Sequence, residues 1–495
     1  MQGVIYTMLI VPVVFALVAI TNRLSNNVLH LINRIVALVV AGCFIRMTTM
    51  LAPNAVFQEG LFYLDALNMW VLCIVISLYF VGAMLSKNYL TREETRGYLD
   101  RGKTYIGKYY ALFTMFVWTM VLALLVENLG LMWVCIEATT LVSALLVSFK
   151  FTRSALEATW KYIMVCTVGI CLALLGTIIL YYAQMQFLGH DNPLSWVYLK
   201  QNAQNLDPNL IKLSFLFVLI GYGTKIGLAP MHTWLPDAYS EAPSLISGLL
   251  SGALCSCAIY VFLRNLIIMI PTLGTAFTLN TLYAFAFFTI AIVVPFSLVQ
   301  RDIKRLLAYS SMENIGIMII GIGMFTYASV SAVLLHVFNH ALIKFMLFFV
   351  AGTIIQEYQT KNMMRIHGMI KQTPTTATLL LMGMMAILGI PPFGIFFTKL
   401  TILLEMFKHG QYFWGSALII LLAGVLMGIL YHFLRMLSGK PKKVSQGEML
   451  TTGEVILLSL MLIGTIAISA FLQELPYLQV LLANAAHIVV GGISL

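Results

Sequence analysis

The most constraining feature of this sequence is a succession of apolar runs of about 20 residues, each long enough to cross the hydrocarbon core of a bilayer as a helix. Hydrophobic residues make up 60% of the 495 positions and charged residues 10%, whereas soluble domains have about 45–50% apolar and about 25% charged residues. The runs lack the alternation of apolar and polar residues that a membrane β-barrel needs. The sequence therefore predicts an all-α polytopic membrane protein.

Polar segments divide the apolar runs into about 14 predicted transmembrane helices. The spans are expected near residues 3–21, 29–50, 67–86, 109–128, 129–148, 162–184, 211–230, 243–268, 276–299, 306–325, 329–356, 376–405, 412–436 and 452–472. The tail at residues 474–495 is apolar enough to lie in the membrane interface or to form a short extra span. No loop is long enough for a soluble domain.

Lysine and arginine residues are concentrated in alternate loops, as expected when the basic loops face the cytoplasm. These loops lie at residues 87–108, 150–153, 301–305, 361–371 and 435–443. The alternation places both termini outside, which requires an even number of spans. We therefore attribute the net charge of +10 to membrane topology and expect no nucleic-acid partner. The exception is the loop at residues 231–243, which is predicted to lie inside but contains no lysine or arginine.

Cofactor and catalytic motifs are not recognisable in the sequence. The seven cysteines all fall within apolar segments and form no motif with zinc or iron–sulfur spacing. No nucleophile and base occur at catalytic spacing, and no glycine-rich phosphate loop follows a strand. We expect no disulfide, metal or cofactor in this chain, and we regard a self-contained enzyme as the least favoured interpretation. The first apolar run lacks signal-peptide features and is interpreted as an uncleaved span.

Two charged residues inside predicted spans, Glu137 and Lys225, are candidates for a functional pair. A charge at the bilayer centre costs about 2.5–3.5 kcal/mol on insertion scales, so it needs a partner or a hydrated path. A carboxylate there stays ionised only beside a cation, and Lys225 is the obvious candidate. Two interpretations are open: a static ion pair between two helices, or a proton site whose affinity depends on whether the pair is closed.

His336, His340 and Lys344 recur at intervals of four residues, which places them on one face of a predicted helix. Imidazoles titrate near neutral pH, so such groups with water between them can pass protons along the membrane. Metal binding by the two histidines is less favoured, because no third ligand accompanies them. We interpret this face as proton-conducting.

Two predicted spans are interrupted, at residues 227–232 and 389–394, and Lys225 and Lys399 lie close to the two breaks. Proline removes a helical hydrogen bond, and free backbone groups at membrane depth are tolerated only where they line protein or water. Two broken helices in corresponding positions are typical of inverted-repeat transporters. We therefore predict two inverted five-helix repeats, with chain divisions at residues 1–108, 109–268, 269–436 and 437–495.

Four further carboxylates have roles that the sequence leaves open. Asp237 and Glu241 are either solvated loop charges or part of a proton-uptake site. Glu313 lies deeper in the tenth span and is the better candidate for a buried site. Glu405 has two possible partners near the end of the twelfth span, Lys399 and Lys408.

The segment from Lys225 to Pro243, KIGLAPMHTWLPDAYSEAP, resembles the signature of the antiporter-like subunits of respiratory complex I, Mrp-type antiporters and group 4 membrane-bound [NiFe] hydrogenases. Supporting matches are QRDIKRLLAYSS at residues 300–311 and the helix with His336, His340 and Lys344, so the resemblance covers most of the chain. It implies that Glu137 and Lys225 form a functional pair. It also implies that Lys399 ends the proton route on the outer side.

One position departs from the family pattern, which usually has a lysine in the eighth span, four residues before a tyrosine and eight before an arginine. Tyr260 and Arg264 match, but Ser256 occupies the place of the lysine. The relay from Lys225 to the histidines therefore lacks its usual link. Water near Ser256 or His232 bridges the gap in one interpretation, and the subunit conducts weakly in the other.

Three features of the chain are most similar to the F-type subunits of hydrogenase-4 and related hydrogenlyase complexes. They are Ser256, the sequence YSSMENIG at residues 309–316 and the chain length. This resemblance implies a proton-translocating subunit coupled to redox chemistry in its partners, which are other membrane subunits and a peripheral hydrogenase module with NiFe and iron–sulfur centres. The expected location is the cytoplasmic membrane of a bacterium or archaeon. Alternatives are a subunit of a Mrp-type Na⁺/H⁺ antiporter or of complex I, and a structural anchor with a decayed proton path. The residues expected to carry protons are Glu137, Lys225, His232, His336, His340, Lys344 and Lys399.

Overall fold

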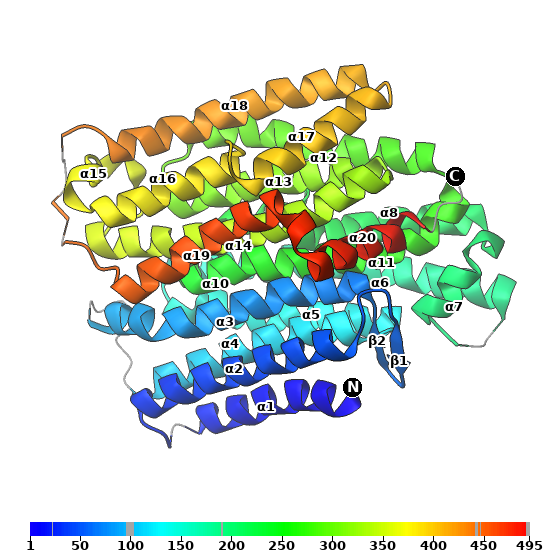
Figure 1. Cartoon of the computed structure of the whole chain (residues 1–495), viewed down its shortest axis with the longest axis horizontal. Coiled ribbons are helices and arrows are strands. Elements are labelled where there is room, and N and C mark those ends of the chain that lie inside the picture. The colour runs from blue at the N-terminus through cyan, green and yellow to red at the C-terminus, as the bar shows by residue number, and fades with distance from the viewer. Residues whose placement is uncertain (22, 96–102, 190–191, 441–443, 446, 492–495) are drawn as a thin grey trace. The chain divides into compact units, whose positions relative to one another are not determined.

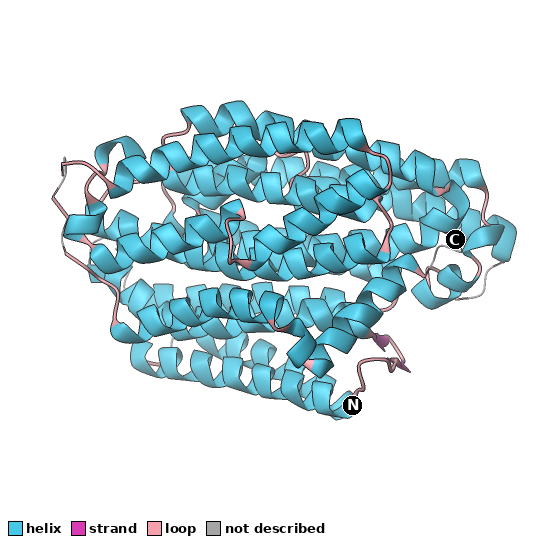
Figure 2. Cartoon of the chain, turned by 45° about the horizontal axis from the view of Figure 1, so that its top comes forward, coloured by secondary structure: helices cyan, strands magenta, loops and turns pink. Residues whose placement is uncertain are grey.

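The structure is a computed structural model of the chain, and it describes residues 1–21, 23–95, 103–189, 192–440, 444–445 and 447–491. Within these ranges nearly all residues are helical, and the named strands form a single short hairpin (Figure 2). The predicted all-α membrane fold is therefore confirmed. Parts of the predicted basic loops, residues 96–102 and 441–443, lie outside the described residues, as does the end of the tail.

The chain folds into two compact units. The first comprises Met1–Gly227, Ala253–Asn280 and Tyr477–Leu495, and the second comprises Leu228–Gly252 and Thr281–Pro476. Their boundaries differ from the repeat boundaries expected from the sequence, and the inverted repeats stay a prediction.

In the first unit, long helices run side by side, with a hairpin of two antiparallel strands between α2 and α3 (Figure 1). Helix α1 packs against α2 and α4, and α6 packs along α8. The elements of this unit are α1 (Gln2–Ile20), α2 (Asn26–Met50), β1 (Phe57–Glu59), β2 (Phe62–Leu64), α3 (Ala66–Thr95), α4 (Lys103–Leu125), α5 (Leu129–Val147), η1 (Ser148–Lys150), α6 (Arg153–Leu188), α7 (Trp196–Gln201), η2 (Ala203–Asn205), α8 (Pro208–Ile226), α11 (Cys255–Leu273) and most of α20 (Pro476–Val490).

In the second unit, α14 is packed against α10, α13, α16, α17 and α19, and most of its residues are buried. The elements of this unit are α9 (Trp234–Glu241), α10 (Ser244–Leu249), the start of the π-helical turn η3 (Leu250–Leu254), most of α12 (Thr275–Val299), α13 (Ile303–Gly323), α14 (Tyr327–Tyr358), η4 (Met363–Arg365), α15 (Met369–Gln372), α16 (Pro374–Leu388), α17 (Gly394–Lys408), α18 (Tyr412–Leu437), α19 (Thr452–Ala470) and η5 (Leu472–Glu474).

Both predicted helix breaks are present. Helix α8 is closed by Gly227 with φ of 106°, and helix α16 is closed by Gly389 with φ of 79°. This left-handed conformation is strained for residues with a side chain, so glycine is favoured at a helix end. The prolines that follow cannot continue the helix. The chain resumes as helix at Trp234 in α9 and at Gly394 in α17.

The number of long apolar helices agrees with the predicted spans. Thirteen of the described helices are long and apolar enough to cross a membrane. The short helices α16 and α17 together occupy the predicted twelfth span, which brings the count of spans to the expected fourteen. The predicted tail contains α20, an apolar helix of 15 residues.

The predicted inside loops of the second unit meet at one end, which we call its basic end. The loop before α13 contacts the loop after α14, since Met363 N–H donates to the Arg301 carbonyl at 2.8 Å. The segment before α15 contacts the end of α18, because Gly368 N–H donates to the Ser438 carbonyl at 3.0 Å. These contacts support the loop assignment made from charge.

Candidate functional site

Lys225 lies in the last turn of α8 and is buried. Its ammonium donates hydrogen bonds to the Thr140 hydroxyl of α5 at 2.7 Å and to the Tyr162 hydroxyl of α6 at 3.0 Å. The Tyr162 ring also lies 5.2 Å from the ammonium, within cation–π range. Ser143 of α5 hydrogen-bonds the same tyrosine hydroxyl at 2.7 Å. Lys225 is thus held by hydroxyl groups of two neighbouring helices.

Glu137 lies one helical turn before Thr140 on α5, and its carboxylate accepts a hydrogen bond from the Thr140 hydroxyl at 3.1 Å. A hydroxyl has one donor and two acceptor positions, so Thr140 accepts from Lys225 and donates to Glu137. The structure brings the two predicted residues together, but Thr140 joins them in place of a direct ion pair. Thr140 and Tyr162 were not candidates from the sequence.

Small residues bring α6 and α8 close enough for Lys225 of α8 to contact Tyr162 of α6. A β-carbon on Gly221 of α8 would lie 2.5 Å from the backbone nitrogen of Ala173 on α6. A β-carbon on Gly169 of α6 would lie 2.5 Å from the Thr224 side chain, next to Lys225. Real β-carbons do not approach other atoms so closely, so the glycines set the spacing of the two helices.

Arg264, one of the two matched positions in the eighth span, forms a buried bidentate ion pair. Its guanidinium donates to both oxygens of Asp65, at 2.8 and 2.6 Å, and stacks 4.3 Å from the Trp196 ring. Asp65 also caps α3 by accepting from the N–H groups of Leu67 and Asn68. Arg264 therefore ties α11 to α3. Ser256, eight residues before Arg264 on α11, is also buried.

His336 is fully buried on α14, and both of its ring nitrogens have partners. Nδ1 lies 2.8 Å from the Thr398 hydroxyl of α17, and Nε2 lies 3.1 Å from the Asn314 side-chain oxygen of α13. The amide nitrogen of Asn314 donates to the Glu313 carboxylate at 2.7 Å. His336 and Glu313 are therefore connected through one amide side chain.

Lys344 is also fully buried on α14. Its ammonium donates to the Leu307 carbonyl of α13 at 2.7 Å and to the Ser310 hydroxyl. His340 is buried on the same helix, and its Nε2 atom has no hydrogen-bond partner in the described part of the chain. The three residues of the predicted conducting face thus lie inside the protein.

Lys399 of α17 forms an ion pair with Glu313 of α13, with 2.6 Å between Nζ and Oε1. The ammonium also lies 3.4 Å from the Leu388 carbonyl at the end of α16, where the helix dipole favours a cation. A cavity of 320 Å³ lies beside the pair and is lined by both residues. Glu405 pairs with Lys408 at 3.4 Å, so Glu313 is the partner of Lys399.

Helix α13 organises this second cluster. Its residues Leu307, Ser310, Glu313 and Asn314 contact Lys344, Lys399 and His336. Of these, sequence reasoning had identified only Glu313 as a candidate for a buried site. The segment YSSMENIG offered a signal, because polar residues inside an apolar span need partners.

His232 lies in the turn between α8 and α9 and is largely buried. Its Nδ1 atom has no hydrogen-bond partner among the described residues. Near it, the Ala229 N–H that the helix break frees donates to the Thr289 hydroxyl of α12 at 2.9 Å. The broken backbone is therefore satisfied by a side chain, as buried polar groups require.

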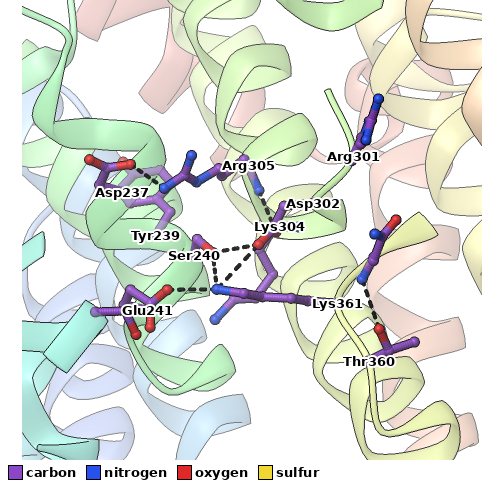
Figure 3. A network of polar contacts seen from close by, with 12 residues as sticks. Asp237, Tyr239, Ser240, Glu241, Arg301, Asp302, Lys304, Arg305, Thr360 and Lys361 are labelled. Atoms are coloured by element: carbon purple, nitrogen blue, oxygen red, sulfur yellow. Dashed lines mark hydrogen bonds and ion pairs between the residues drawn. The ribbon is translucent and has the colours of Figure 1, made fainter. Parts of the chain in front are cut away.

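A network of ion pairs at the basic end holds α9 (Figure 3). Asp237 pairs with Arg305 at 2.6 Å, and Glu241 pairs with Lys361 at 2.6 Å. Asp302 caps α13 and also lies 3.4 Å from the Lys361 ammonium. Asp237 and Glu241 are thus helical and ion-paired, so the first of their two interpretations, as solvated loop charges, is wrong, and a role in proton uptake stays a prediction.

Lys361 is the hub of this network. Burial alone lowers the pKa of its ammonium. The charge of Asp302 and the hydrogen bond to Glu241 raise the pKa by more than burial lowers it, so the net shift is upward. The loop at residues 231–243 has no basic residue of its own. Its negative charges are instead balanced by lysine and arginine side chains from two neighbouring segments.

The family described as NADH:quinone oxidoreductase/Mrp antiporter, TM, matches residues 126–427, which is more than half of the chain. The chain belongs to this family. It is therefore an antiporter-like membrane subunit, as its signature and its buried charges predicted.

Three relatives illustrate the likeness. The chain is 36% identical over 351 residues to the hydrogenase-4 component F homolog of Methylacidiphilum infernorum, covering 70% of this chain and 73% of the relative. A chain of the Mrp complex from Dietzia sp. DQ12-45-1b has the same fold, with a TM-score of 0.85, 18% identity and coverage of 99% and 98%. A chain of an archaeal membrane-bound sulfane sulfur reductase gives a TM-score of 0.85, 20% identity and full coverage of both chains. The two solved structures share the fold of this chain over nearly its whole length.

Proposed function

We propose that this chain is the proton-translocating subunit of an energy-converting membrane-bound [NiFe] hydrogenase complex of the hydrogenase-4 or formate hydrogenlyase type. The observation that carries the proposal is the pair of buried polar clusters, around Lys225 and around Lys344. Charged groups inside an apolar helical protein are costly, and a purely structural chain has little need of so many. The relative from Methylacidiphilum infernorum, named a hydrogenase-4 component F homolog, supports the choice of complex.

In the first unit, protons are taken up from the cytoplasmic side near Glu137 and Lys225. Thr140 contacts both groups, so a change of charge at either one is felt by the other across one hydroxyl. When Lys225 loses its proton, Glu137 loses the favourable field of the ammonium and its affinity for a proton rises. The pair thereby alternates between two charge states.

In the second unit, protons move by way of His336 and His340, with Lys344 in register on the same helix, and leave by Lys399. Asn314 contacts both His336 and Glu313, so protonation near the histidine changes the field at the Glu313–Lys399 pair. An ion pair weakened in this way releases the lysine toward the cavity beside it. His232 has a ring nitrogen with no hydrogen-bond partner in the described ranges. We assign to it the proton transfer that a lysine in the eighth span serves in other family members.

The partner subunits supply the redox chemistry, and NiFe and iron–sulfur centres belong to them. We place the complex in the cytoplasmic membrane of a bacterium or archaeon, with the basic loops inside. The test is purification of the tagged protein in a mild detergent, identification of co-purifying subunits by mass spectrometry, and an assay of hydrogen evolution. Hydrogenase subunits with activity are expected.

A second candidate is a subunit of a Mrp-type Na⁺/H⁺ antiporter or of complex I. The fold shared with a chain of the Dietzia Mrp complex favours it. Co-purification of antiporter or quinone-reductase subunits, without hydrogenase subunits, would replace the first proposal by this one. A structural anchor with a decayed path predicts normal proton translocation when Lys225 and Lys399 are replaced by alanine.

A further inference from the structure

A cavity of 310 Å³ opens at the basic end of the second unit. It is lined by Gln300, Arg301, Asp302, Arg305, Lys361 and Asn362. Three of these side chains are cationic, and they come from two segments, the start of α13 with the loop before it and the loop after α14. Nothing in the proton route uses this cavity.

The cavity keeps an excess of positive charge. Arg305 and Lys361 each bind a carboxylate on α9, but their side chains remain 41% and 46% exposed. A guanidinium has five N–H donors and an ammonium has three, so both retain donors for another acceptor. Arg301 forms no ion pair with the described residues, and Figure 3 shows it on the side away from Asp237 and Glu241.

Asp302 also lines the cavity, but its carboxylate is already occupied. Oδ1 accepts from the N–H groups of Lys304 and Arg305. Oδ2 accepts from the Ser240 hydroxyl at 2.8 Å and pairs with Lys361. An anion placed beside these cations therefore meets Arg301, which has no ion pair with the described residues. It also meets the remaining donors of Arg305 and Lys361, whose charges are already shared with the carboxylates that they bind.

The helix that runs into the lining segment of this cavity ends in exposed apolar side chains. At the end of α12, Phe296, Leu298 and Val299 are 45%, 49% and 72% exposed, and Arg301 follows two residues later. Aliphatic side chains beside basic groups at the end of a transmembrane helix match the junction between acyl chains and headgroups. A free anion would have no use for this apolar surface.

We propose that the cavity binds the phosphate headgroup of an anionic phospholipid, with its acyl chains against the end of α12. Basic pockets between transmembrane helices are suited to such headgroups. The phosphate receives charge-assisted hydrogen bonds from Arg301, Arg305 and Lys361. The bound phosphate then supplies a counter-charge for Arg301, which forms no ion pair with the described residues.

The test uses the detergent-purified full chain, with phosphatidylglycerol added and the bound lipid counted by native mass spectrometry. Arg301→Gln is the informative variant, because its loss breaks no ion pair in the described structure. Its affinity for phosphatidylglycerol is expected to fall about tenfold, the effect of losing one charge-assisted hydrogen bond to the phosphate. Arg301→Lys keeps the charge and is expected to retain most of the binding.

The matched control is Arg153→Gln, an exposed arginine that begins α6 beside the exposed side chains of Phe151 and Leu156. It is expected to leave phosphatidylglycerol binding unchanged. An equal loss in both variants would overturn the proposal, because binding would then follow overall charge. The proposal would also be overturned if the wild-type protein bound phosphatidylcholine as well as it binds phosphatidylglycerol. Displacement of phosphatidylglycerol by millimolar inorganic phosphate would overturn it too, because the ligand would then be a free anion.

Discussion

The hydroxyl of Thr140 is the group on which the Glu137–Lys225 arrangement depends most directly. Thr140→Val removes that hydroxyl while preserving the shape of a fully buried side chain. Of the partners that the structure describes, the variant leaves Lys225 with Tyr162, and it removes the donor to Glu137. The two charged groups are then no longer joined.

The size of the effect follows from the two hydrogen bonds that are lost. Hydrogen bonds to charged groups contribute about 1.5–3 kcal/mol each. If the hydrogen bonds of Thr140 stabilise the transition state of the rate-limiting proton transfer, losing the free energy of one of them raises that barrier. Translocation then slows by about 10- to 150-fold. Thr140→Ser keeps the hydroxyl and is expected to retain most of the rate.

The assay is the initial rate of proton translocation in membrane vesicles that contain the complex, followed with a pH-sensitive dye and normalised to redox turnover. The matched control is Thr139→Val, since Thr139 is equally buried on the same helix but its hydroxyl donates to the carbonyl of Ile136 in its own helix. The reasoning is refuted if Thr140→Val translocates protons as fast as Thr139→Val.

Three further predictions concern the ion pairs. Asp237→Arg and Arg305→Asp are each expected to lower the unfolding temperature, and the double variant is expected to restore part of it. Because the pair is partly exposed, the coupling energy should be below about 1 kcal/mol. A double variant without any recovery would contradict the pairing. The upward-shifted pKa of Lys361 means that its stabilisation is present below its unfolded pKa of 10.5 and is lost as pH rises through the higher folded value. The difference in unfolding temperature between wild type and Lys361→Gln should therefore be constant near neutral pH and shrink in strong alkali; shrinkage below about pH 9 would refute the sign. Asp65→Asn leaves Arg264 buried without its carboxylate and is expected to lower the unfolding free energy by about 3–5 kcal/mol. The measurement is a denaturant titration, and a loss below about 1 kcal/mol would show that the fold does not need the pair.

The sequence allowed the helix breaks and the buried charges to be predicted because both depend on local chemistry. Glycine tolerates the left-handed conformation at a helix end and proline cannot continue a helix, as at Gly227 and Gly389 and the prolines that follow them. A lysine such as Lys225 or Lys399 inside an apolar run stands out because it is costly there. The family signature around these residues was equally local.

The partners of those charges were not predictable in the same way. Thr140 is separated from Lys225 by 85 positions, and a threonine or asparagine in an apolar span does not stand out by cost. Asp237 and Glu241 could be interpreted as loop charges because their cations, Arg305 and Lys361, come from distant segments. Tertiary packing decides such pairings.

The central claim is that this chain carries the protons that its complex moves. The most direct measurement is the number of protons translocated per hydrogen molecule evolved, in proteoliposomes that contain the purified complex with either wild-type chain or Lys225→Ala. The account predicts that the variant still evolves hydrogen but builds no proton gradient. A gradient of wild-type size at equal hydrogen evolution would contradict it.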